Sequence, residues 1–277
     1  MIILKGIEAA RAINEDIKEN LKKADRIPKL AVIRVGERED DISYERGILK
    51  KMETLGIETE VHTFWEDISN DDFVMEFEKI NSDSGVDGIL CFMPLPPQID
   101  ANKISQLIDP AKDMDGISPI NQAKIYAGDK SGFAPCTAEA VMAILDYYDI
   151  DVTGKNVAVV GRSLVIGRPV AMMLMQKNAT VTICHTKTRD VKAECQKADI
   201  IVAAAGVPKM ITKDYVPEGA TVIDVGIHVA SDGSMCGDVD YEAVADHCEA
   251  ITPVPGGVGS VTTSVLAGHV MRAFNMG

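Results

Sequence analysis

Short apolar runs alternate along the chain with stretches whose apolar residues recur at helical spacing. In the first half, amphipathic stretches at Asp40–Glu58 and Asp71–Asn81 separate the runs KLAVIRVG, ETEVHTFW and GVDGILCFMPLPP. The second half contains the runs KNVAVVGRS, ATVTICHTKT, ADIIVAAAG, ATVIDVGI and EAITPV. Strands that alternate with helices are typical of βαβ units, so the pattern predicts an α/β fold with a mostly parallel sheet.

The same pattern predicts two α/β domains. A polar, glycine-containing segment follows Gly116 and precedes a helical stretch at Thr137–Tyr148, which indicates a domain crossover. The closing segment predicts one helix after a glycine-rich turn, and we expect this helix to pack on the first domain. We therefore expect a first domain of residues 1–118, completed by residues 260–277, and a second domain of residues 119–259.

Composition excludes several classes of protein. The 277 residues are 46% hydrophobic, and their net charge of -14 opposes binding to nucleic-acid phosphates. No stretch approaches the roughly 20 apolar residues that a membrane span requires, and the first apolar run is too short for a signal peptide. We therefore expect a cytoplasmic protein that binds no membrane. The six cysteines are scattered without CxxC pairs, so we expect buried thiols and no metal site.

The segment NVAVVGRSLVIGRPVAMML has the form of a phosphate-binding turn. A strand leads into Gly161, and after Gly167 a helix opens near Pro169, so backbone N–H groups at the helix start could face a pyrophosphate. The spacing is not G-x-G-x-x-G, because Ser163 replaces the second glycine and the loop is longer. A strand, turn and helix that bind no ligand would show the same sequence pattern, so the turn alone does not identify a cofactor site.

The strand TVTICHTKTR ends where a dinucleotide fold meets the adenosine ribose. NAD-binding folds usually carry an acidic residue there. This chain instead has His185, Thr186, Lys187, Thr188 and Arg189. Hydroxyls and cations, with Arg162 in the preceding turn, suit a 2′-phosphate and favour NADP over NAD. The alternative is a solvated basic loop.

Three further segments place polar groups at predicted strand ends or on a helix. CFMPLPPQID with KDMDG, and TPVPGGVGSVTT, follow predicted strands, where open α/β sheets bind ligands, although each alone is more typical of a structural turn. In DDISYERGILKKMETLGIE, Tyr44 and Ile48 share a helix face. Both could simply pack on a core, but a lysine at the second position would make a catalytic pair.

Taken together and in order, these segments resemble the bifunctional methylenetetrahydrofolate dehydrogenase/methenyltetrahydrofolate cyclohydrolase family. The matching segments are VGERxxxxxY, MPLP, PAKDMDG, APCTAEAV, GKNVAVVGRSLVIGRP, ATVTICHTKT, VIDVGI, GDVDYE and TPVPGGVGSVTT. The resemblance covers nearly the whole chain. It implies an N-terminal folate-binding catalytic domain, a Rossmann-type NADP or NAD domain, a cleft between them and usually a homodimer.

The resemblance also implies roles for individual residues. Tyr44 matches the tyrosine that lies against the pteridine, and Asp115 matches the aspartate that anchors the folate ring. The other expected substrate-binding residues are Pro94, Leu95, Pro255, Gly256 and Gly257. The expected cofactor-binding residues are Thr137, Gly161, Arg162, Ser163, Ile166, His185 and Thr186, the last in place of a common serine.

Three positions depart from the family pattern. Ile48 stands where the family usually has a lysine, Phe92 where it has a glutamine, and Asp41 where it has a serine. The family uses the lysine and glutamine for the cyclohydrolase step. Hydride transfer needs mainly oriented reactants, whereas hydrolysis of the methenyl product needs a proton carrier. We therefore hypothesise a dehydrogenase whose cyclohydrolase activity is weak or lost.

Alternative functions stay open at this stage. The chain could be fully bifunctional, with water activated by Asp115 or by Lys51, which lies seven residues after Tyr44 on nearly the same helix face and about 10 Å along the axis. It could be a catalytically silent protein that binds folate or a dinucleotide. An unrelated Rossmann dehydrogenase would leave the N-terminal matches unexplained.

Overall fold

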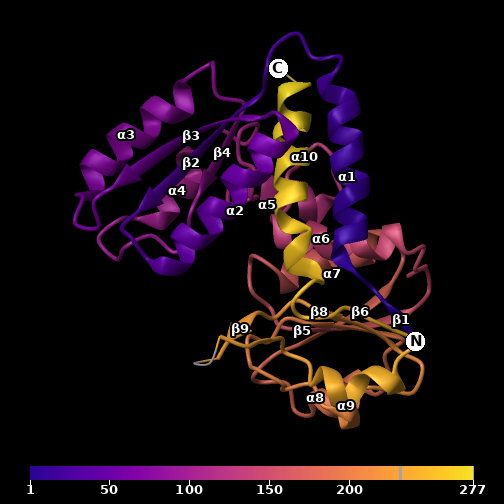
Figure 1. Cartoon of the computed structure of the whole chain (residues 1–277). Coiled ribbons are helices and arrows are strands. Elements are labelled where there is room, and N and C mark those ends of the chain that lie inside the picture. The colour runs from indigo at the N-terminus through magenta and orange to yellow at the C-terminus, as the bar shows by residue number, and fades with distance from the viewer. Residues whose placement is uncertain (231–232, 277) are drawn as a thin grey trace. The chain divides into compact units, whose positions relative to one another are not determined.

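The computed structural model describes residues 1–230 and 233–276 and has an α/β fold (Figure 1). The chain divides into two compact units, each built on its own parallel sheet. The six-strand unit comprises Met1–Arg11 and Thr137–Thr262, and the three-strand unit comprises Ala12–Cys136 and Thr263–Gly277. The predicted α/β class with two domains is confirmed. Residue 277, the last of the expected closing segment, lies outside the described residues.

The sheet of the six-strand unit contains the second series of predicted strands. Its strand order is β1 (Ile2–Ile3), β11 (Ala250–Ile251), β8 (Thr221–Asp224), β7 (Ile200–Ala203), β5 (Asn156–Val160) and β6 (Thr180–Cys184). Every pairing in it is parallel. A separate antiparallel pair joins β9 (His228–Val229) to β10 (Met235–Cys236).

Helices cover both faces of this sheet, which explains why its strands are continuous apolar runs. The helices of the unit are α6 (Cys136–Tyr147), α7 (Gly167–Gln176), α8 (Val191–Cys195) and α9 (Tyr241–Val244). Short 3-10 turns occupy Lys213–Tyr215, Ala245–His247 and Val258–Ser260. Figure 1 shows α8 and α9 on one face and α7 on the other. Alternate residues of β5 point to opposite faces, and Val157 to Val160 are all buried.

The sheet of the three-strand unit has β2 (Lys29–Val35) between β3 (Glu58–Phe64) and β4 (Gly88–Cys91), all parallel. The helices that lie wholly within it are α2 (Glu39–Leu55), α3 (Asn70–Ser82), α4 (Ala101–Leu107) and α5 (Pro119–Ala127). One core cluster joins Ile33 of β2 and Ile89 of β4 to Phe77 of α3 and Ile104 of α4. Thus α3 and α4 cover one face of this sheet.

The unit boundaries differ from the expected ones at both ends of the chain. They fall within α1 (Gly6–Leu21), at the start of α6, and at the start of α10 (Thr262–Phe274). β1 belongs to the six-strand unit because Ile2 and Ile3 pair with β11. The segment expected to be a crossover contains α5, with the Ser118 hydroxyl accepting from Asn121 N and with Gly128 ending the helix. This segment belongs to the three-strand unit, where Asn121 bonds Asp113.

Within each of the two parallel sheets, all strands run in the same direction, so their carboxyl ends share one edge. Open α/β sheets bind ligands at this edge. The predicted site residues therefore group by unit, as described below. Within the described part of the chain, no helix is long and apolar enough to span a membrane.

Candidate functional site

The segment KDMDG runs beside β4 and parallel to it in the three-strand unit. Ile89 N donates to Lys112 O (2.6 Å), Met114 N donates to Ile89 O (3.2 Å), and Ile89 forms a parallel bridge with Asp113. This register places Asp115 level with Cys91, the last residue of β4. The carboxylate predicted to anchor a folate ring is therefore at the carboxyl edge of the sheet.

Tyr44 and Phe92 meet at the same edge. Phe92 continues β4, its N donating to Ile33 O (2.9 Å), and its ring centroid lies 5.6 Å from that of Tyr44. Tyr44 is 40% exposed, whereas Phe92 is 7% and Ile48 0% exposed. Pro94 is exposed and Leu95 half-buried just beyond Phe92. Ile48 is therefore a core residue, while Tyr44 offers an accessible aromatic face.

The Asp115 carboxylate is bound by Cys136. Its Oδ1 accepts from Cys136 N (2.7 Å) at the start of α6. Burial raises the pKa of Asp115, the Cys136 hydrogen bond and His269 lower it, and the neighbouring Asp113 raises it. Gly116 follows with φ 62°, and a Cβ there would lie 2.5 Å from Phe133 O. Only glycine fits this turn, which fixes the direction in which the Asp115 backbone leaves the sheet edge.

The predicted phosphate turn in the six-strand unit is closely packed. Gly161 has φ 138°, and a Cβ there would lie 2.0 Å from Ala204 O. A Cβ on Gly167 would lie 2.1 Å from Gly161 O. Ser163 Oγ accepts from Ile166 N (3.1 Å), so the hydroxyl shapes the turn before α7. These residues fit a dinucleotide, because the bare backbone and the N-terminus of α7 are available to a pyrophosphate.

The adenosine-ribose strand end lies beside this turn. β5 and β6 pair from Asn156↔Thr180 to Val160↔Cys184, and Gly161 N donates to Cys184 O (2.9 Å). Arg162 and His185 therefore follow adjacent strands. His185 Nδ1 accepts from Lys187 N (3.1 Å), and Thr188 Oγ1 accepts from His185 N (2.8 Å), which folds HTKT into a tight turn.

Pro255, Gly256 and Gly257 belong to the six-strand unit, in a turn that lines a pocket of about 260 Å3 together with Asp224, Gly226 and Ser260. Gly256 has φ 100°, and its carbonyl accepts from Gly6 N (2.9 Å). Thr137 lies half-buried in the first turn of α6. The structure thus gathers Tyr44, Leu95 and Asp115 in one unit, and the turn residues 255–257 with the cofactor-side residues in the other.

A buried carboxylate network at the carboxyl edge of β8 was missed by sequence reasoning. Asp224 accepts from Gly226 N (3.0 Å), Asp238 N (2.9 Å) and Val239 N (3.0 Å). Asp238 accepts from Gly206 N, and its Oδ1 lies 2.8 Å from His228 Nε2. Both aspartates lie in recognised motifs, VIDVGI and GDVDYE, but their pairing joins segments far apart in sequence and has no local signal.

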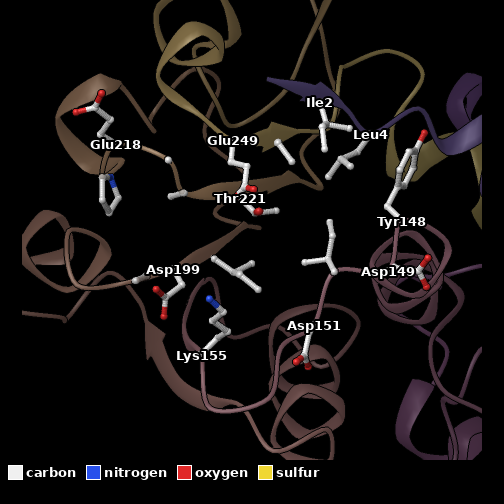
Figure 2. A pocket seen from close by; sticks show the side chains of 17 residues that line it. Ile2, Leu4, Tyr148, Asp149, Asp151, Lys155, Asp199, Glu218, Thr221 and Glu249 are labelled. Atoms are coloured by element: carbon white, nitrogen blue, oxygen red, sulfur yellow. The ribbon is translucent and has the colours of Figure 1, made fainter.

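A pocket of about 430 Å3 lies at the opposite, amino-terminal edge of the six-strand sheet (Figure 2). Its acidic side chains include Asp151, Asp199, Glu218 and Glu249. Asp199 accepts from Asn156 N (2.8 Å) and Asp151 accepts from Thr153 N (2.9 Å), so these two carboxylates stabilise local turns. Because open α/β sheets bind ligands at the other edge, this pocket is no candidate active site.

A parallel sheet with a glycine turn before a helix, and with hydroxyl and basic groups at the next strand end, defines a dinucleotide-binding α/β protein. Family comparison specifies it further. Residues 135–276 match the model described as tetrahydrofolate dehydrogenase/cyclohydrolase, NAD(P)-binding domain, and residues 4–115 match the catalytic domain of the same name. The chain belongs to the tetrahydrofolate dehydrogenase/cyclohydrolase family.

Individual relatives are similar to this chain along its full length. The curated "Bifunctional protein FolD" of Clostridium kluyveri is 51% identical over 275 residues, covering 98% of this chain and 97% of the relative. The solved bifunctional FolD methylenetetrahydrofolate dehydrogenase/cyclohydrolase of Campylobacter jejuni has a TM-score of 0.97 at 38% identity, covering 100% of this chain and 99% of that one. The Trypanosoma brucei dehydrogenase-cyclohydrolase, solved with NADP and an inhibitor, has a TM-score of 0.93 at 31% identity, covering 100% and 98%.

Proposed function

We propose that the protein oxidises 5,10-methylenetetrahydrofolate to 5,10-methenyltetrahydrofolate with NAD(P). The observation that carries this proposal is the grouping of Tyr44 and Asp115 at one sheet edge, in a chain that also has a closely packed dinucleotide turn at Gly161. The full-length relatives named as methylenetetrahydrofolate dehydrogenases support it.

The residues of this chain would act by binding and orientation. The Asp115 carboxylate can accept hydrogen bonds from the N–H groups of a pterin ring, and the accessible Tyr44 ring can lie against that ring. The Gly161 turn and the start of α7 would hold the pyrophosphate. When bound, the nicotinamide supplies the hydride acceptor. Because hydride leaves the methylene carbon with assistance from the folate nitrogens, no protein proton relay is needed.

We propose NADP as the preferred cofactor. The strand end after β6 presents Thr186, Lys187 and Arg189, and Arg162 follows the adjacent strand β5. A 2′-phosphate gains charge-assisted hydrogen bonds from such groups. An NAD site would instead place a carboxylate there for the ribose hydroxyls.

The second family activity is hydrolysis of the methenyl product. The names of the relatives and the residues at two positions of this chain point to different conclusions about it. The names of the relatives favour the fully bifunctional alternative over the expected loss of cyclohydrolase. The proposal that hydrolysis is weak in this chain rests on Ile48 and Phe92 alone. Ile48 is fully buried and Phe92 packs on Tyr44, so neither carries a proton at the position where the resemblance implies a lysine and a glutamine.

Lys51 is the residue on which the bifunctional alternative depends most. Its Nζ donates to Ser264 Oγ of α10 (3.1 Å). Burial lowers the pKa of Lys51, and the charge of Lys18 lowers it further. A lysine with a lowered pKa is better suited to accept a proton at neutral pH. This hydrogen bond also directs the amine toward α10.

A paired assay on the purified protein tests these proposals. First, oxidation of methylenetetrahydrofolate is followed with NADP and with NAD. Second, the decay of supplied methenyltetrahydrofolate is compared with its decay in buffer. We expect oxidation with a higher kcat/KM for NADP, and hydrolysis close to the buffer rate. Hydrolysis as fast as oxidation would establish the bifunctional alternative, and absence of oxidation with either cofactor would favour a silent binding protein.

Two further expectations stay predictions: a homodimer and a cytoplasmic location. Mass measured by light scattering at several concentrations tests the homodimer. Fractionation of cells that express the protein tests the location.

A further inference from the structure

A buried histidine on α10 contacts the segment that carries Asp115. His269 is 2% exposed, and its Nδ1 lies 2.7 Å from Met114 O. A carbonyl oxygen only accepts hydrogen bonds, so Nδ1 carries the proton and donates it to Met114. The residue held in this way immediately precedes the carboxylate proposed to bind the folate ring.

The same carbonyl has a second donor. Cys136 Sγ donates to Met114 O (3.3 Å) and lies 3.9 Å from His269 Nδ1. The backbone N of Cys136 meanwhile donates to Asp115 Oδ1. The first residue of α6 therefore holds both Met114 and Asp115, and His269 closes the arrangement from α10.

The surroundings of His269 hold its ring in place. The Phe133 ring meets the imidazole edge-to-face at 5.3 Å between centroids, and the Arg272 guanidinium lies 4.1 Å from the Phe133 centroid. Arg272 Nη2 also donates to Gly132 O (2.8 Å). Because its position is fixed by several contacts, the His269 ring can fix the position of Met114 in turn.

We propose that His269 is a positioning residue for Asp115: by donating to Met114 O, it holds the carboxylate where the folate ring binds. This inference rests on the proposed function. The mechanism gives His269 no contact with substrate, so its effect is on the binding of folate. Cofactor binding belongs to residues of the other unit and is not expected to change.

The charges around Asp115 affect its pKa, so the pH dependence of folate oxidation is a second property that can be measured. The ionised carboxylate accepts from the pterin, and the groups that face it are Asp113 on its own segment, Cys136 of α6 and His269 of α10. Burial raises the pKa of Asp115, and His269 lowers it. Loss of the imidazole should therefore move the acid limb of kcat/KM for folate to higher pH. A loss of packing alone would lower thermal stability without moving that limb.

The experiment compares His269→Leu, which removes the donor, with His269→Asn, whose amide can replace Nδ1. The binding of tetrahydrofolate is measured by calorimetry and the oxidation of methylenetetrahydrofolate as a function of pH. For the leucine variant we expect the Kd for tetrahydrofolate and the KM for methylenetetrahydrofolate to rise about five- to tenfold, the worth of one buried hydrogen bond, with the KM for NADP unchanged. The asparagine variant should restore both to within about twofold.

Ser264→Ala is the matched control, because Ser264 is a fully buried polar residue of the same helix that bonds Lys51 rather than Met114. We expect its Kd for tetrahydrofolate to stay at the wild-type value. Unchanged folate binding in His269→Leu would overturn the inference, as would equal losses in the leucine and asparagine variants with an unmoved acid limb. A wild-type protein that neither binds tetrahydrofolate nor oxidises its methylene derivative would instead overturn the proposed function.

Discussion

At the scale of single residues, Asp224 shows how a buried carboxylate makes stability depend on pH. Asp224 is 3% exposed, and burial together with the nearby charge of Asp238 raises its pKa to about 6 despite three backbone N–H donors. In the unfolded chain the same carboxyl titrates near 3.8. Between these values the folded protein binds a proton that the unfolded chain has released. The stabilising contribution is complete below the unfolded pKa and is lost as pH rises through about 6.

Asp224→Asn should remove this dependence. As pH rises from 4 to 7, the free energy of unfolding of the wild type should fall relative to that of the variant by about 2.4 kcal/mol, somewhat less than the full shift of roughly two pKa units at 1.36 kcal/mol each, because the unfolded carboxyl is already partly ionised at pH 4. Urea unfolding at several pH values measures the difference. Asp190→Asn, which removes an exposed charge at the N-cap of α8, separates burial from net charge. A constant difference between wild type and Asp224→Asn across this range would contradict the prediction.

The sequence predicts which residues are chemically special more readily than what holds them. Tyr44 and Asp115 were predicted as site residues from their motifs, and both lie at the carboxyl edge of the three-strand sheet. His269 could have been noticed only as a polar residue within an apolar helical stretch. Its contact with Met114 spans 155 positions in sequence, and no local periodicity encodes such a pairing.

At the scale of elements, strands and helices were predicted where an apolar run was bounded by glycine, proline or a capping residue. The strand ending at Gly161 and the helix opening near Pro169 were both predicted, and they are β5 and α7. β1 was missed because two residues show no periodicity, and it exists only through its pairing with β11. α5 was missed although Ser118 and Gly128 are ordinary helix start and stop signals.

The turn between β5 and α7 yields a prediction for an element. Gly161→Ala should weaken NADP binding about tenfold or more, because the added Cβ would have to displace Ala204 O and φ 138° is strained for alanine. The strain should also lower the free energy of unfolding by about 1–3 kcal/mol. Calorimetric titration with NADP and urea unfolding measure the two effects.

Gly47→Ala is the matched control for this substitution. Gly47 is an exposed residue inside α2 with no atom within 4 Å of the added Cβ. Alanine should therefore raise the free energy of unfolding by about 0.5–1 kcal/mol through its better helix propensity. NADP binding should be unchanged in this variant. If Gly161→Ala bound NADP as tightly as Gly47→Ala, the Gly161 turn would not be the pyrophosphate site.

At the scale of the whole molecule, each unit is assembled from two segments that are far apart in the sequence. The six-strand unit takes Met1–Arg11 from the N-terminus, and the three-strand unit takes its last segment from the C-terminus. The assignment of the closing helix to the first domain stays a prediction from the sequence, and the pairing of β1 with β11 was not predicted. The proposed activities divide in a similar way: the residues proposed for oxidation are retained in this chain, whereas Ile48 and Phe92 stand where the resemblance implies the lysine and glutamine used for hydrolysis.

Restoring those two positions together tests whether they control hydrolysis. In Ile48→Lys with Phe92→Gln, methenyl hydrolysis should rise at least about tenfold above the wild-type rate, within the range that a positioned proton carrier contributes. Lysine at a site that is 0% exposed should also cost stability, about 1–3 kcal/mol in urea unfolding. The double variant is needed because residues that share one site are not additive.

Lys51→Met in the wild-type background is the companion experiment. If Ile48 and Phe92 limit hydrolysis, Lys51→Met should leave the already low hydrolysis rate unchanged, since the Lys51 amine bonds Ser264. Oxidation with NADP should persist in both variants, because hydride transfer uses neither lysine. A wild-type rate of hydrolysis that is high, insensitive to the double substitution and abolished by Lys51→Met would assign the proton transfer to Lys51 and make the chain bifunctional.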